Sequence, residues 1–151
     1  MVHFVDYHNQ RSYLIDHVFK FHPVMEQYVQ SKYHALLHGE RETVSVHFRF
    51  PVHAADMETY FPKQPSDEWY RRVMQENFDV SKVEFLIFSE NQYEAERILQ
   101  PINDASFRYT LVHDEEDFAN SLLLMSLCKH HIVGSSSFGF WGMMGQATVY
   151  L

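Results

Sequence analysis

The chain has little cysteine, little positive charge and no long apolar run, and each shortage excludes a class of protein. Its 151 residues include one cysteine, Cys128, which excludes an intramolecular disulfide and a cysteine-rich zinc site. Against 20 acidic residues there are only 12 lysines and arginines, so the formal net charge is -8. An acidic domain repels a phosphate backbone, and nucleic-acid binding is not expected. A single well-placed arginine could still hold a small phosphate ligand.

Membrane and targeting signals are also missing. The longest strongly apolar stretch lies around residues 122–128, well below the roughly 20 residues that span a bilayer. The N-terminus MVHFVDYHNQ has no basic start followed by an apolar run, so it does not resemble a secretory signal. The chain as given is therefore expected to be soluble, with neither signal nor anchor.

Several signatures of catalytic and metal sites are absent as well. The sequence has no GxxxxGK[ST] phosphate loop, no HExxH metal pair and no GxSxG nucleophile elbow. The chain has eleven histidines, and pairs such as His34 and His38 have the spacing of two metal ligands on one helix face. No carboxylate completes an obvious ligand set beside them. We therefore expect no dedicated metal site and no cofactor.

What the chain does have is enough apolar and aromatic residues for one folded domain. Hydrophobic residues make up 46% and aromatic residues 16%. Two parts are expected within one compact unit, an N-terminal helical segment at 1–41 and an α/β domain at 42–151. Residues 11–38 suggest helix with a break near Pro23 and a stop at Gly39. Its expected buried face is formed by Met25, Tyr28, Val29, Tyr33, Leu36 and Leu37.

From residue 42 onward, strand patterns alternate with helix patterns. The sequence predicts strands at 42–50, 83–88, 108–112, 131–134 and 147–151. It predicts helices at 66–77, from residue 91, at 115–129 and in FGFWGMMG, and it predicts a loop at 52–65. The apolar positions of the helix at 115–129 include Phe118, Leu122, Met125 and Leu127. Such alternation predicts an α/β fold, a Rossmann-like open parallel sheet with helices on both faces. Ligands of these sheets bind beyond the carboxyl ends of the strands.

The end of the first strand carries His47 and Arg49, which share a face because they are two residues apart. A guanidinium at this position suits a diphosphate, since its fork of N–H donors matches phosphate oxygens. The alternative is that Arg49 makes a structural ion pair and that His47 fills a polar gap.

Two further strand ends carry polar residues. Ser89 and Glu90 lead from the second strand into a helix, where they are either a ligand contact or a simple N-cap. The stretch VGSSSFGFWG passes from a strand through serines into a helix start, which can hold an anion on backbone N–H groups and hydroxyls. A plain βα turn accounts for it equally well.

Three stretches, in this order, resemble glycosyltransferase family 11, the α-1,2-fucosyltransferases. SVHFRF followed by DEWYRRVM resembles the family's strand ending His-x-Arg-Arg and the helix after it. VEFLIFSEN resembles its next strand, and SLLLMSLCKHHIVGSSSFGFWG resembles its most distinctive stretch. The match covers most of residues 42–145 and is closest to the nematode-type branch.

The resemblance implies the donor-binding lobe of a two-lobed, B-type glycosyltransferase. It implies inverting transfer of fucose from GDP-fucose to the 2-hydroxyl of a terminal galactose on a glycan acceptor, without a metal, in the Golgi. Arg49 matches the arginine that holds the diphosphate, and His47 the histidine beside the nucleotide. The family's phosphate-side loop is matched by Ser135, Ser136, Ser137 and Phe138. Asp117 is a weaker match, to a residue that contacts the guanine or the ribose.

The chain departs from the family pattern at several positions. Phe50 stands where the family has a second arginine, and Ser135, Gly139 and Phe140 replace an asparagine, a serine and a tryptophan. A full family member needs a second lobe, so we expect a fragment or truncated form whose acceptor lobe lies outside this chain or in a partner chain. Two functions stay open, a fucosyltransferase part and a non-catalytic module that kept the fold. A flavodoxin-like or phosphatase-like protein would need a glycine-bearing loop after the first strand, where this chain has RFPVHA.

Overall fold

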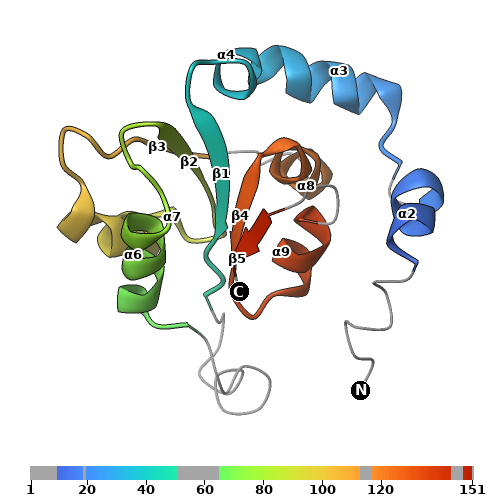
Figure 1. The fold of residues 1–151 in the computed structure, drawn as a ribbon. Coiled ribbons are helices and arrows are strands. Elements are labelled where there is room, and N and C mark those ends of the chain that lie inside the picture. Colours follow the sequence, from blue (N-terminus) through green and yellow to red (C-terminus); the bar gives the residue numbers. More distant parts are fainter. Residues whose placement is uncertain (1–9, 19, 51–64, 113–116, 144–147, 151) are drawn as a thin grey trace.

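The computed structural model describes residues 10–18, 20–50, 65–112, 117–143 and 148–150, and its centre is one parallel sheet (Figure 1). Five strands lie in the order β3-β2-β1-β4-β5, and every neighbouring pair is parallel. They are β1 Glu42–His47, β2 Val83–Phe88, β3 Tyr109–Leu111, β4 His130–Val133 and β5 Thr148–Tyr150. The predicted open parallel sheet is therefore confirmed. The predicted loop at 52–65 lies almost entirely outside the described residues.

Strand β1 occupies the middle of the sheet and is buried on both faces. Its valines, Val44 and Val46, lie in one core, while Thr43 and Ser45 are buried on the opposite face. Sequence alternation had predicted a strand through residue 50, but β1 ends at His47. The ladder loses regular pairing there, although the backbone N–H of Phe48 still donates to the carbonyl of Phe88 at 2.9 Å.

Helices cover both faces of the sheet and complete two cores. Helices α6 (Asp67–Glu76) and α7 (Gln92–Leu99) cover one face, where Met74 and Ile98 are buried with Phe85 of β2. Helices α3 (Pro23–Lys32) and α8 (Phe118–Leu127) lie on the other, where Val29 and Leu124 are buried with Leu86. Phe85 and Leu86 of β2 lie in different cores because successive residues of a strand point to opposite faces of the sheet.

Local capping fixes where these helices begin. The side chain of Ser66 accepts the backbone N–H of Trp69 at 3.1 Å, which confirms the predicted N-cap of α6. Asp117 caps α8 in the same way, so this helix begins at Phe118 and not near residue 115. Helix α8 ends at Leu127, two residues before the predicted end, and β4 begins at His130.

The N-terminal region is helical but more broken than predicted. It contains α2 (Arg11–Tyr13), a π-helical turn η1 (Leu14–Val18), α3 and α4 (His34–Leu37). Val29 and Tyr33 are buried as predicted, but Tyr28 is 45% exposed and accepts a hydrogen bond from Lys32 Nζ. The buried stripe follows an i, i+4 row, which leaves Tyr28 to one side. The boundary at residue 41 stays a prediction. None of the described helices could cross a bilayer.

Candidate functional site

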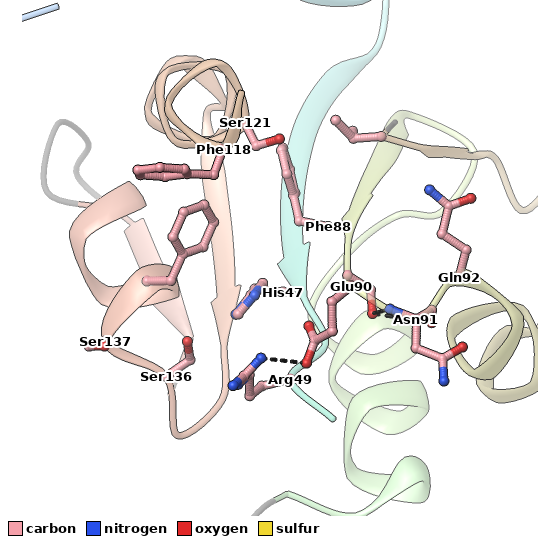
Figure 2. Close-up of a pocket in the computed structure, with 13 residues that line it drawn as sticks. His47, Arg49, Phe88, Glu90, Asn91, Gln92, Phe118, Ser121, Ser136 and Ser137 are labelled. Atoms are coloured by element: carbon pink, nitrogen blue, oxygen red, sulfur yellow. Dashed lines mark hydrogen bonds and ion pairs between the residues drawn. The ribbon is translucent and has the colours of Figure 1, made fainter. Parts of the chain in front are cut away.

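A pocket of about 850 Å³ lies at the point where the order of the strands in the sheet reverses. From β1 the chain adds β2 and β3 on one side and then β4 and β5 on the other, so the switch point lies between β1 and β4. Ligands of open α/β sheets bind at such a point, beyond the carboxyl ends of the strands. Residues that follow β1, β2 and β4 line this pocket (Figure 2).

Arg49 reaches this pocket and forms an ion pair with Glu90. The Nη1 atom of Arg49 lies 2.6 Å from Oε1 of Glu90, which also accepts the backbone N–H of Phe50 at 3.1 Å. The structural ion pair that the sequence offered as the alternative for Arg49 is therefore present, and it joins residues that follow β1 and β2. No other hydrogen bond of Arg49 occurs among the described residues, so most of its guanidinium fork can still face a ligand.

His47 lies in the wall of the pocket and is almost completely buried. Loss of hydration lowers the pKa of His47 to about 4, with a smaller contribution from the charge of Arg49. The imidazole is therefore neutral at pH 7, and within the described part of the chain its Nδ1 atom has no hydrogen-bond partner. A buried polar atom without a partner is rare in folded proteins.

Two neighbours set the position of His47. The backbone carbonyl of His47 accepts the hydroxyl of Tyr70 at 3.3 Å, and the imidazole lies 5.3 Å from the ring of Phe138. A Cβ on Gly139 would lie 2.9 Å from Cγ1 of Val133 and 3.3 Å from Nδ1 of His47. Glycine at 139 thus lets helix α9 (Ser137–Gly142) approach both β4 and β1 closely.

The serine loop after β4 supplies hydroxyl groups to the pocket. Ser136, Ser137 and Phe138 line it, but Ser135 does not. The backbone N–H of Ser136 donates to Gly134 at 2.7 Å, and its hydroxyl oxygen caps α9 by accepting from Gly139 at 3.4 Å. The amide of Ser136 is thus already used. Each of the two lining serines still has a hydroxyl proton to donate.

The remaining candidates have mixed positions. Ser89 and Glu90 both line the pocket, but neither caps α7. That role belongs to Asn91, whose side chain accepts the N–H of Glu94 at 3.1 Å. Asp117 does not line the pocket, and its carboxylate accepts the N–H of Ala119 at 2.8 Å. Its contact with a base or ribose stays a prediction.

Sequence reasoning missed about half of the pocket wall. The missed residues all line it and come from the ends of β2 and β3 and from the starts of α7 and α8: Phe88, Asn91, Gln92, Val112, Phe118 and Ser121. From the sequence, Phe118 is only one of the apolar positions of its helix, and in the structure it is 75% exposed. The available signal was the spacing of Phe118 and Ser121, which places both on one face of α8.

Comparison with known proteins supports the fold. No protein-family model matches the chain, and no curated protein matches it in sequence. A crystal structure of POFUT1 in complex with GDP-fucose matches 85% of this chain with a TM-score of 0.55 and 10% identity. The match covers 46% of that protein, so the chain spans about half its length. The chain therefore shares its α/β fold with that protein, while membership of the α-1,2 family stays a prediction.

Proposed function

We propose that the pocket binds GDP-fucose and that the chain is the donor-binding part of a fucosyltransferase. The observation that carries the proposal is the meeting of the Arg49 guanidinium and the Ser136 and Ser137 hydroxyls in one pocket at the switch point of the sheet. The neighbour POFUT1, whose fold is similar, was crystallised with GDP-fucose. A guanidinium with neutral hydroxyls fits the two phosphates of such a donor.

The same groups suit the chemistry of transfer. When the bond between the sugar carbon and the β-phosphate oxygen breaks, the electron pair remains on that oxygen and negative charge builds on the departing GDP. Arg49 would stabilise this charge, since a preorganised cation is most effective where charge develops during the reaction. His47 is neutral in its buried position and adds no competing positive charge.

The acceptor side of the reaction rests on the sequence resemblance alone. It comprises inverting transfer to the 2-hydroxyl of a terminal galactose, a glycan acceptor, and an acceptor lobe or partner chain beyond these residues. The Golgi compartment rests on the same resemblance. We place these features in the proposal because the three motifs occur in the family's order.

A non-catalytic module that kept the fold is the second candidate. The ion pair of Arg49 with Glu90 favours it, because a carboxylate 2.6 Å from the guanidinium offsets the charge that a diphosphate needs. Phe50, in place of a second arginine, points the same way. This candidate predicts a stable fold with no affinity for GDP and no transfer or hydrolysis of GDP-fucose.

Arg49→Ala is expected to weaken GDP binding about tenfold to a hundredfold, the value of a charge-assisted hydrogen bond. Arg49→Lys should retain part of the affinity, because it keeps the charge and loses the fork. Arg97→Ala is the matched control, since Arg97 pairs with Asp67 and Glu94 away from the pocket. Calorimetric titration with GDP measures all three. Absence of heat for the unmodified chain at millimolar GDP would favour the non-catalytic module.

A further inference from the structure

One aromatic ring in the pocket wall is unusually open to solvent. Phe118 begins helix α8, lines the pocket and is 75% exposed. Ser121, one turn further along, lines the same pocket. Residues three apart share a face of a helix, so α8 presents an aromatic ring and a hydroxyl to the cavity together.

The pocket has two chemically different ends. In Figure 2 the labelled side chains of Phe118 and Ser121 lie on one side of His47, and Arg49, Ser136 and Ser137 lie on the other. The guanidinium of Arg49 and the serine hydroxyls of the loop after β4 lie at one end, and the exposed ring of Phe118, with the hydroxyl of Ser121 near it, marks the other. A nucleoside diphosphate has the same division, with anionic phosphates at one end and a flat aromatic base at the other.

An exposed aromatic ring is not by itself a binding site, and this chain provides the comparison. Tyr93 of α7 is 76% exposed, as open as Phe118, yet it does not line the pocket. Isolated surface aromatics of this kind are normal. Phe118 differs because its ring lies in the same cavity as the guanidinium of Arg49.

We propose that Phe118 is the stacking platform for the nucleobase of the bound nucleotide. This subsite rests on the proposed function, since it needs the diphosphate to be held at Arg49. A base that covers the ring would remove apolar surface from water on both partners. Because every base has a π-face, the platform supplies affinity without choosing among bases, and the Ser121 hydroxyl can contact polar atoms beside it.

The test compares GDP with inorganic pyrophosphate, which carries the phosphates without the base. Calorimetry is run on the unmodified chain and on Phe118→Ala, Tyr93→Ala and Arg49→Ala. Phe118→Ala is expected to weaken GDP about tenfold, the value of one stacked base, and to leave pyrophosphate unchanged. Arg49→Ala should weaken both ligands, and Tyr93→Ala neither. In Phe118→Trp, GDP should quench the fluorescence that the new indole adds to that of Trp69 and Trp141.

The outcomes separate the subsite from the proposed function. Unchanged GDP affinity in Phe118→Ala, or equal losses for GDP and pyrophosphate, overturns the subsite. If Arg49→Ala alone weakens GDP, the donor site stands and only the stacking platform is wrong. If the unmodified chain binds neither ligand, both proposals are wrong.

Discussion

Acidification from about pH 7.5 to about pH 5 is expected to lower the free energy of unfolding by about 4 kcal/mol. The cause is a pair of histidines that are buried and neutral, His47 and His131, each with its pKa lowered from 6.5 to about 4. The unfolded chain takes up protons below pH 6.5, whereas the folded chain does so only near pH 4. Their stabilising effect is therefore complete above pH 6.5 and is lost as the pH falls toward 4.

His131 is the more deeply buried of the two. It has no exposed surface, and its Nδ1 atom lies 2.7 Å from the hydroxyl oxygen of Ser45. Among the described residues its Nε2 atom has no partner, so in the protonated ring one of the two N–H groups would lack a hydrogen-bond acceptor. Burial is the main cause of its lowered pKa, and the neighbouring His130 adds to it. A charge at this position would cost more than at an exposed histidine.

Urea unfolding followed by circular dichroism at several pH values measures the effect. The slope of stability against pH should correspond to the uptake of about two protons on unfolding near pH 5. Hydrogen bonds lower the pKa of the exposed carboxyls Glu42, Asp79 and Asp104 from ordinary values of 4.5, 3.8 and 3.8, which already lie below pH 5.

Two substitutions assign the protons. Asparagine keeps a polar group near the Nδ1 position and does not titrate, so His47→Asn and His131→Asn should each remove about one proton from the slope. Equal stability at about pH 7.5 and about pH 5, or an unchanged slope in both variants, would contradict the expectation.

The sequence predicted the elements whose signal is local. The strand at 83–88 matches β2 because a continuous apolar run suits a strand buried on both faces. The helix at 66–77 matches α6 because Ser66 and the acidic residues after it form a local N-terminal signal. These patterns need no knowledge of distant partners, so single-sequence reasoning can find them.

What the sequence could not predict depends on long-range register. Arg49 and Glu90 are 41 positions apart in the sequence, and they meet because β1 pairs with β2. Ser45 and His131 are 86 positions apart, and they meet because β1 pairs with β4. The helical pattern marked Phe118 only as an apolar position and gave no sign that its ring is open to solvent. Its exposure follows from where α8 begins, at the edge of the pocket.

Gly134→Ala is expected to destabilise the protein by about 3 kcal/mol, the upper end for overpacking. A Cβ at this position would lie 2.2 Å from the hydroxyl oxygen of Tyr70 and 3.4 Å from its Cζ atom. Only the hydroxyl collides severely, but the buried ring cannot move away easily. It packs 4.6 Å from the ring of Phe48 and 5.0 Å from that of Trp69.

Tyr70→Phe should rescue Gly134→Ala, because it removes the colliding oxygen. Alone it should cost about 1 kcal/mol, the value of its hydrogen bond to His47. The double variant should be little less stable than Tyr70→Phe, which gives a favourable coupling of about 2–3 kcal/mol. Tyr93→Phe, which removes an exposed hydroxyl, is the control. Urea midpoints measure the cycle, and additive costs would show that the collision is not the cause.

The same cycle connects packing with ligand binding. The carbonyl that Tyr70 contacts belongs to His47, the last residue of β1 and two residues before Arg49. A collision that moves this end of β1 also moves Arg49, so Gly134→Ala should lose about as much free energy of GDP binding as free energy of unfolding. The double variant should regain most of its affinity for GDP. A variant that is destabilised but binds GDP normally would show that the pocket does not depend on this contact.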